Sequence, residues 1–151
     1  MRQIFSFVIV AILILGSFYF FLQKPAPAKY QDLTLIQLEE TELQVRLAET
    51  DAEHRQGLSN TKSLADGEGM LFIYEKPAKQ SFWMKDMNYS LDIIWIDERN
   101  RVIGVEKNVS PDTFPLIFSS PGEVKYVLEV PAGFSNRSNI EIGQILNFRH
   151  R

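Results

Sequence analysis

The chain has 151 residues, the length of a single domain, and it contains no cysteine, so thiolate metal sites, cysteine nucleophiles and disulfides are excluded. Of its 16 Lys and Arg residues, Arg2 and Lys24 precede residue 29, so residues 29–151 carry 14 basic and 19 acidic residues, a net charge of −5. This balance argues against nucleic acid as a partner, because a phosphate-binding face needs clustered Lys and Arg.

An uncharged, mainly apolar segment lies near the N-terminus. It runs for 19 residues from Ile4 to Leu22, and a helix of this length, at ~1.5 Å per residue, reaches ~28 Å and can span a bilayer. A cleaved signal peptide is the alternative, since Arg2 precedes the segment and Ala26-Pro27-Ala28 has the form of a cleavage site. We favour the anchor, because the apolar core exceeds the usual ~7 to 15 residues and Phe18 to Phe21 form an aromatic belt.

These features divide the chain into three parts. Residues 1–22 are the membrane anchor or signal segment, residues 23–29 are a Pro-rich spacer that cannot continue a helix, and residues 30–151 form a single β-rich domain. We expect residues 4–22 to bind the membrane in a single pass, with the domain on the extracytoplasmic side. The alternative is secretion after cleavage of the signal. Basic residues on both sides of the segment set its orientation only loosely.

The first part of the domain predicts a hairpin followed by a short helix. Residues 33–38 and 41–48 have strand character, and apolar and polar side chains alternate in the second run. The sequence from Thr50 to Glu53 has the form of a capping box, and Gly57 is placed to end a helix of about two turns.

The rest of the domain predicts mostly strands. Six runs of strand length are separated by turn residues, at 70–74, 81–85, 91–96, 101–109, 125–130 and 141–148. The Pro- and Ser-rich loop between residues 109 and 125 is unusually long and is the best place for a lid. Residues 131–138 predict one or two helical turns. The expected fold is mainly β (α+β), a small barrel-like or strongly curved, mostly antiparallel sheet with two short helices, preceded by one N-terminal transmembrane helix.

A family resemblance rests on five blocks of sequence in order, which are Arg55 with Gly57-Leu58, Gly69-Met70-Leu71-Phe72, Phe82-Trp83-Met84-Lys85, Leu91-Asp92-Ile93 and Tyr126 to Gly133. Together they cover roughly residues 41–146, and they resemble the family called domain of unknown function 192. The resemblance implies a small β-rich domain, commonly bacterial or archaeal and often exported, and no particular reaction. Many relatives look to carry cysteines in the loop that corresponds to residues 109–123. This chain has none, so a function that depends on them is not implied.

Charged side chains within apolar strands define the candidate site. Strand alternation puts Lys125 and Glu129 on one face, and we expect them to converge with Lys85, Asp92 and Arg55. Asp92 and Glu129, with Lys85, are the candidate catalytic residues, since repulsion between two partly buried carboxylates raises one pKa for acid/base work. The alternative is a salt-bridge network that fixes strand register. We favour this network over the catalytic interpretation, because a buried charge without a partner costs several kcal/mol.

Large apolar side chains cluster in the same blocks, and they are Phe72, Phe82, Trp83, Met84 and Trp95. They form either a platform for a sugar ring or apolar peptide, or part of the core, and we favour the core because aromatic residues in strands mostly pack inside. Trp83 is the member we expect to be exposed, since Ser81 and Lys85 share its face of the strand.

Histidine is too sparse for a built-in metal site. His54 stands among charged residues of the predicted helix and is interpreted as solvated, while His150 lies in the C-terminal tail. The sequence has neither an HExxH motif nor an Asp-rich calcium loop, so we expect no metal and no cofactor. It also lacks the GxSxG motif of serine hydrolases.

Three classes of function follow. We favour a membrane-tethered module that binds a small ligand or a protein partner through Arg55, Trp83, Lys85, Asp92, Lys125 and Glu129. The second class is a hydrolase or lyase that uses the carboxylate pair Asp92 and Glu129, although no recognisable catalytic motif supports an enzyme. The third is a structural component of an envelope complex, in which the anchor is the working part.

Overall fold

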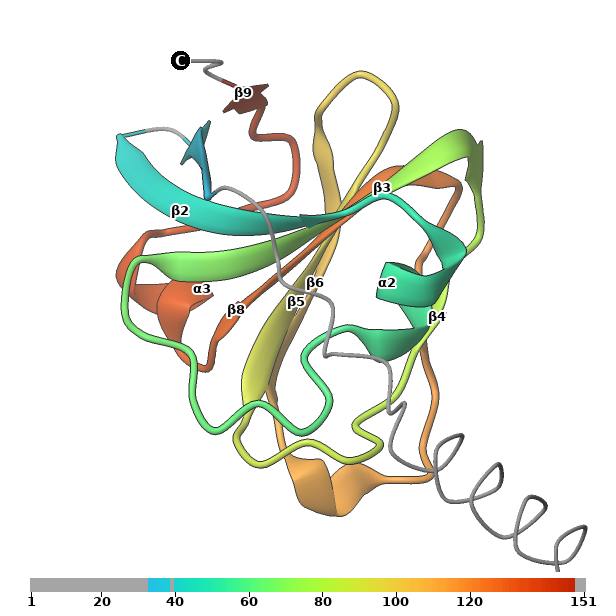
Figure 1. The fold of residues 1–151 in the computed structure, drawn as a ribbon. Coiled ribbons are helices and arrows are strands. Elements are labelled where there is room, and N and C mark those ends of the chain that lie inside the picture. The colour runs from blue at the N-terminus through green and yellow to red at the C-terminus, as the bar shows by residue number, and fades with distance from the viewer. Residues whose placement is uncertain (1–32, 39, 149–151) are drawn as a thin grey trace, which may run out of the picture.

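The computed structural model describes residues 33–38 and 40–148, so the predicted anchor at 1–22 and spacer at 23–29 lie outside the described residues. Its centre is a seven-stranded sheet in the order β6-β5-β8-β3-β2-β1-β9, strongly curled into a half-barrel (Figure 1). The expectation of a mainly β, strongly curved domain with two short helices is confirmed.

The elements have the following bounds. The sheet contains β1 (Thr34–Leu38), β2 (Thr41–Ala48), β3 (Glu68–Ala78), β5 (Leu91–Ile96), β6 (Val102–Val109), β8 (Val124–Pro131) and β9 (Leu146–Phe148). A separate ribbon pairs β4 (Ser81–Phe82) with β7 (Phe118–Ser119). The helices are α2 (Asp51–Gln56), the 3-10 helix η1 (Pro111–Thr113) and α3 (Phe134–Arg137).

Neighbouring strands of the sheet pair antiparallel except β2 and β3, which run parallel because α2 and the loop after it carry the chain back. The predicted hairpin of β1 and β2 is confirmed. The sheet curls until its two edges meet near one end. There the backbone N–H of Leu146 donates to the carbonyl of Asn100 at 2.7 Å, and that of Val102 donates to Gln144 at 2.9 Å.

The two faces of the sheet pack two separate cores. The inner core lies within the curl and receives side chains from all seven strands; it consists of Ile36, Leu38, Leu43, Val45, Leu71, Ile94, Ile96, Val102, Leu128, Val130, Phe134, Ile140 and Leu146. The outer core lies on the other face of β3, β5 and β8; it consists of Ala48, Leu58, Met70, Phe72, Met84, Leu91, Ile93, Trp95, Val109, Val124 and Val127. Every residue of β5 is buried, because this strand is covered on both faces.

The outer core is covered by short elements, and α2 is one of them (Figure 1). The predicted capping box is present, with the Thr50 side chain accepting from the Glu53 N–H and the Glu53 carboxylate accepting from the Thr50 N–H at 2.9 Å. Gly57 follows the helix with a φ of +47°, a region that favours glycine.

Two strand predictions were too long. The run 81–85 stops pairing at Phe82, because the chain turns after Met84 and Asp86 adopts a φ of +56°. The run 141–148 pairs from Leu146 onward, because a turn with Gly143 at a φ of +103° precedes it. The long loop after residue 109 contains η1 and β7, and its pairing with β4 fixes it against the outer core.

The helices of the described part are all short, and none is long and apolar enough to cross a membrane. The transmembrane helix expected at residues 4–22 lies outside that part.

Candidate functional site

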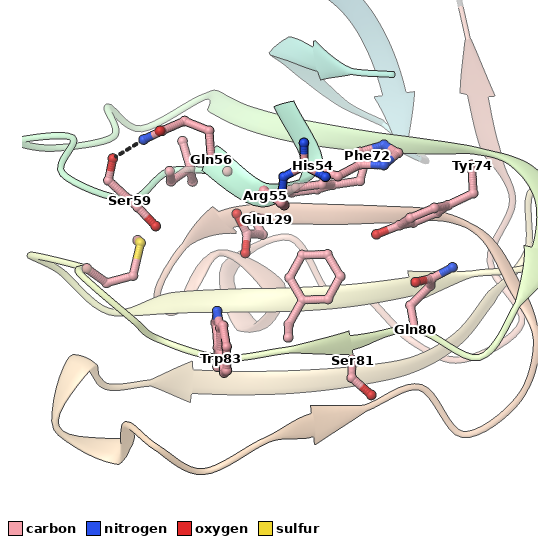
Figure 2. A pocket seen from close by; sticks show the side chains of 14 residues that line it. His54, Arg55, Gln56, Ser59, Phe72, Tyr74, Gln80, Ser81, Trp83 and Glu129 are labelled. Atoms are coloured by element: carbon pink, nitrogen blue, oxygen red, sulfur yellow. Dashed lines mark hydrogen bonds between the residues drawn. The ribbon is translucent and has the colours of Figure 1, made fainter. Parts of the chain in front are cut away.

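A pocket of about 240 Å³ opens on the outer face of the sheet, between α2 and the β4 segment (Figure 2). Its lining comes from α2 and the turn after it, β3, β4 and β8. The lining residues are His54, Arg55, Gln56, Gly57, Leu58, Ser59, Phe72, Tyr74, Gln80, Ser81, Phe82, Trp83, Met87 and Glu129. Only one carboxylate, Glu129, is among them.

Glu129 lies at the base of the pocket and is 6% exposed. It is in the middle of β8, where its cross-strand neighbours are Met70 of β3 and Ile93 of β5, both fully buried and apolar. Within the described residues its carboxyl makes no hydrogen bond or ion pair, and Oε2 is completely buried. Burial therefore raises the pKa of the Glu129 carboxyl to about 8.

His54 borders the pocket from α2. Its Nε2 lies 2.9 Å from the carbonyl oxygen of Ala48 and 3.1 Å from that of Ile73. Both neighbours are acceptors, so Nε2 donates in this arrangement. The ring also packs on Tyr74, with 4.5 Å between centroids. The prediction that His54 is solvated was wrong, because α2 lies directly on the sheet and turns this side chain inward.

Aromatic rings form the wall of the pocket. Phe82 meets Phe72 edge-on at a centroid distance of 4.8 Å, and on its other side it meets the buried Trp95 at 5.6 Å. Trp83 is 54% exposed, as predicted, and its ring contacts Phe114 of the long loop at 6.1 Å. The core interpretation is thus confirmed for most of the aromatic set, while Trp83 keeps a face toward solvent.

Two tyrosines lie near the carboxyl of Glu129. Desolvation by burial is the main cause that raises the pKa of the Tyr74 hydroxyl well above its usual range, and the charge of Glu129 adds to it. Desolvation by burial raises the pKa of Tyr89, and the charges of Glu129 and Glu68 add to it, opposed by its hydrogen bond to Thr61, whose Oγ1 lies 2.6 Å away, and by the charge of Arg46. Both hydroxyls therefore stay neutral around Glu129 at physiological pH.

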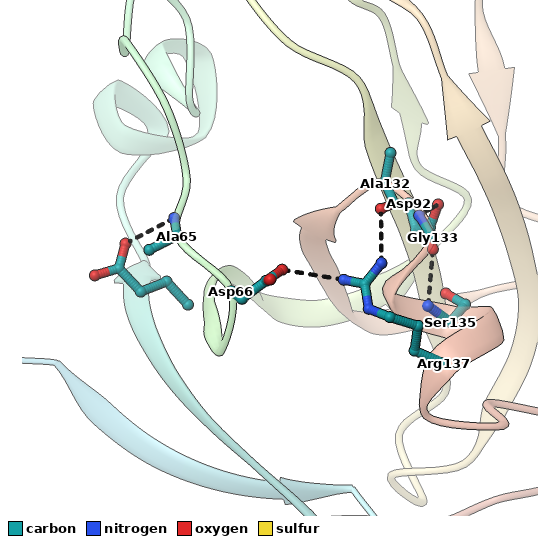
Figure 3. Close-up of polar contacts among 8 residues, drawn as sticks. Ala65, Asp66, Asp92, Ala132, Gly133, Ser135 and Arg137 are labelled. Atoms are coloured by element: carbon teal, nitrogen blue, oxygen red, sulfur yellow. Dashed lines mark hydrogen bonds and ion pairs between the residues drawn. The ribbon is translucent and has the colours of Figure 1, made fainter.

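Asp92 is not part of this pocket. It pairs in register with Val130, the residue after Glu129, so the two carboxylates project from opposite faces of the sheet. Asp92 instead accepts three backbone N–H groups, from Asn108 at 2.8 Å, Gly133 at 3.1 Å and Ser135 at 2.8 Å. Figure 3 shows the contacts with Gly133 and Ser135. The predicted carboxylate pair is therefore corrected, because neighbouring antiparallel strands put residues offset by one position on different faces.

The other predicted site residues are spread over the surface. Arg55 lines the mouth of the pocket and is exposed. Lys85 lies just outside, with Nζ 6.0 Å from the centre of the Trp83 ring. Lys125 is remote, and its Nζ donates to the carbonyl of Glu75 at 2.9 Å. These cations form no ion pair with Asp92 or Glu129 in the described structure, so the predicted salt-bridge network is absent there.

Sequence reasoning missed part of the pocket lining, notably His54, Tyr74, Gln80 and Met87. One signal was available for Tyr74. Phe72 and Tyr74 alternate along β3, and pairing of β3 with β8 places this face beside Glu129. The pairing partner itself is a long-range contact, and no local pattern reveals it.

Chemically, the pocket offers one buried acid, several aromatic side chains and polar side chains such as those of Gln56, Ser59 and Ser81. The described residues contain no group of three His, Asp or Glu side chains arranged to hold a metal ion. The acid is protonated in most molecules at neutral pH, since its pKa lies near 8. It can donate a hydrogen bond in that form and can attract a cation when it ionises.

Comparison with solved structures gives two close matches in fold. A protein of unknown function from Novosphingobium aromaticivorans DSM 12444 has a TM-score of 0.76 and 27% identity, covering 82% of this chain and 90% of its own. A protein from Sinorhizobium meliloti 1021, provisionally named a transcription regulator, has a TM-score of 0.75 and 26% identity, covering 82% and 98%. Among curated proteins, none matches the chain significantly.

The sequence also matches a described protein family across nearly the whole of the folded part. The family is DUF192, described as an uncharacterized ACR, and the match runs over residues 34–148. This range begins with β1 and ends with β9, so it contains the curled sheet and every residue of the pocket. The chain therefore belongs to the DUF192 family, the family that the five sequence blocks resembled.

Proposed function

We propose that this domain is a binding module that takes a small ligand into the pocket above Glu129. The observation that carries the proposal is a carboxyl group that is 6% exposed, faces a pocket and has no partner among the described residues. A buried polar group without a hydrogen bond lowers the stability of the fold. Proteins keep such groups where function requires them.

The shape and lining of the pocket support a small ligand. Pockets for drug-sized molecules usually measure roughly 300 to 1000 Å³, and their walls are mainly apolar with a few polar groups that orient the ligand. This pocket is smaller, at about 240 Å³. Aromatic side chains form part of its wall, and Gln56, Ser59 and Ser81 are among the polar residues of its lining. The ligand is therefore a small molecule or the end group of a larger one.

The sequence blocks that carry the family resemblance also meet at this pocket. Four of the five contribute to the lining, through Arg55, Phe72, Trp83 and Glu129 among others. These blocks are far apart in the chain, and only the fold brings them together. This meeting point supports the pocket as the working part of the domain.

Ligand-observed NMR with a library of small fragments tests the proposal on the full chain in detergent micelles. We expect bound fragments to lose affinity by about tenfold or more in Trp83→Ala and in Glu129→Gln, because these side chains form the wall and the base. The matched control is Glu141→Gln, an exposed carboxylate outside the pocket, which leaves binding unchanged. Fragments that bind all variants equally, or a library without any bound fragment, would overturn the proposal.

The membrane tether remains part of this proposal. The apolar run from Ile4 to Leu22 supports it, and the short spacer of residues 23–29 keeps the domain near the bilayer. On this view the domain presents its pocket on the extracytoplasmic side, or in the medium if the segment is cleaved.

The enzyme alternative has lost its second carboxylate, since Asp92 lies on the other face of the sheet. A structural role in an envelope complex is the remaining alternative. In that role the anchor itself is the working part, whereas in a binding module the anchor only holds the domain at the membrane.

A further inference from the structure

We propose that the ligand of this pocket carries a small organic cation, a quaternary or primary ammonium group held between the Glu129 carboxylate and the surrounding aromatic rings. This inference rests on the proposed function and narrows it to one chemical class. Two independent features of the pocket carry it, the missing countercharge at its base and the aromatic side chains of its wall.

The first feature is the missing countercharge. Glu129 lies between Met70 and Ile93, and no Lys, Arg or His of the described chain forms an ion pair with it. A buried carboxylate needs a cation at close range to be stable. Arg55 lines the pocket, but it is exposed at the mouth and makes no ion pair with Glu129. The ligand can supply the charge that the protein does not.

The second feature is the wall. The pocket that contains Glu129 is also lined by four aromatic side chains, those of Phe72, Tyr74, Phe82 and Trp83, and by His54. Figure 2 shows Phe72, Tyr74 and Trp83 around it. The face of an aromatic ring carries a partial negative charge and attracts a cation within ~6 Å of its centre. Trp83 already does so within the protein, because Nζ of Lys85 lies 6.0 Å from its ring centre. Aromatic rings are the usual surroundings of a bound quaternary ammonium group.

A sugar or other polyol fits this pocket less well. Its several hydroxyl groups would each need a hydrogen-bond partner at the base. Next to Glu129 the strand neighbours are apolar, and the side chains of Gln56 and Ser59 already donate to the carbonyl oxygens of Ser59 and Lys85. A quaternary ammonium group has no N–H donor that could be left without a partner, and the N–H donors of a primary ammonium group lie together on one atom that the carboxylate can contact.

Binding of a cation by this mechanism displaces a proton. The titratable and charged groups around the carboxyl are Tyr74 of β3, Tyr89 of the segment before β5, and His54 and Arg55 of α2. Since the pKa of Glu129 is about 8, the free pocket holds a proton at pH 7 and the cation complex releases it. The affinity for the cation then rises roughly tenfold per pH unit up to pH ~8 and levels off above it.

Calorimetric titration of the full chain in detergent micelles tests this inference. The probes are choline and n-butylammonium, and 3,3-dimethylbutan-1-ol is the neutral isostere of choline. We expect both cations to bind at pH 7 with release of close to one proton, measured by repeating the titration in buffers of different ionisation enthalpy. The neutral isostere binds at least roughly tenfold more weakly, because it lacks the charge.

Variants separate this inference from the proposed function. Glu129→Gln keeps the shape of the side chain. We expect it to abolish the proton release and to lower the affinity for choline by roughly tenfold or more. Glu141→Gln should change neither the proton release nor the affinity. If the neutral isostere binds the wild type as tightly as choline, or if the cations do not bind while fragments occupy the pocket, the inference is wrong and the proposed function stands. If neither the cations nor any fragment binds, both are wrong.

Discussion

Two carboxylates on neighbouring strands of this sheet have opposite environments. Asp92 receives three backbone N–H groups, whereas Glu129 receives none and lies between apolar neighbours. They differ by a single position of register, since Glu129 precedes the partner of Asp92. That offset makes one acid a structural centre and the other a candidate ligand-binding group.

Glu129 should make the stability of the domain fall as the pH rises. Its pKa is raised from 4.5 to about 8 on folding, so the folded chain keeps a proton that the unfolded chain releases between these values. The stabilisation is complete below pH ~4.5 and is lost as the pH rises to ~8. We expect the wild type to lose several kcal/mol of unfolding free energy across this range, measured by urea unfolding at intervals of pH.

Glu129→Gln should remove most of this decline and be more stable than the wild type above pH ~8, because a neutral amide needs no proton. Glu141→Gln should keep the decline in stability with rising pH.

Glu53 and Asp97 do not cause such a decline. Hydrogen bonds to the Glu53 carboxylate lower its pKa, and hydrogen bonds from the Arg99 and Arg101 backbone lower that of Asp97 against an opposing desolvation effect. Their stabilisation is therefore lost at acid pH instead. Parallel curves for wild type and Glu129→Gln would contradict the burial of an unpartnered acid.

Short elements at the edges of the sheet decide where the pocket lies. The capping box of Thr50 and Glu53 fixes the start of α2, and Gly57 ends it, so the helix projects His54 and Arg55 over the sheet. Pairing of β4 with β7 holds the opposite wall. Neither element is large, and both depend on the outer core beneath them for their position.

The contacts of Asp92 join β5 to the end of β6 through Asn108, and to the start of α3 through Ser135, the second of which Figure 3 shows. Asp92→Ala leaves three N–H groups without their acceptor, and we expect the free energy of unfolding to drop by about 2 to 4 kcal/mol. Urea unfolding at neutral pH measures this change, and the isosteric Asp92→Asn should lose less.

Asp97→Ala is the matched control for Asp92→Ala. Asp97 also accepts two backbone N–H groups, from Arg99 and Arg101, but in an exposed turn where water replaces the lost acceptor. Its removal should therefore cost about 1 kcal/mol or less. Equal losses of unfolding free energy for the two alanine variants would show that the buried hydrogen bonds of Asp92 stabilise the fold no more than the exposed ones of Asp97.

At the scale of the whole molecule, the sheet curls around one core and carries a second core on its outer face. The pocket belongs to the outer core, and the described residues that line it lie between His54 and Glu129. The binding site and the proposed membrane anchor are thus separate parts of the chain.

Exchange of residues 4–22 for an unrelated apolar segment should therefore leave fragment binding unchanged, within about twofold, in the same NMR titration. The biological activity of the full chain in its cell should also survive the exchange, since any span of this length holds the domain at the membrane. Loss of that activity with intact fragment binding would favour the envelope-component alternative.

Local patterns determined much of this protein. Alternation placed Lys125 and Glu129 on one face of β8, the capping box located α2, and the β1–β2 hairpin followed from two adjacent strands. Each of these depends on interactions within a few residues, which the sequence displays directly. The exposed side chain of Trp83 was predictable for the same reason.

Only the tertiary structure decided which faces meet. The side of the sheet on which Asp92 lies relative to Glu129 depends on strand register, and a shift of one residue reverses it. The position of His54 depends on the packing of α2 against β3, where its contact Ile73 is 19 residues further along the chain. The sequence alone determined a curled β domain with charged residues in its strands. Long-range strand pairing decided that Asp92 accepts hydrogen bonds from the backbone, whereas Glu129 lies at the base of a pocket without a partner among the described residues. The sequence could not show this difference, because neither strand register nor packing has a local signal.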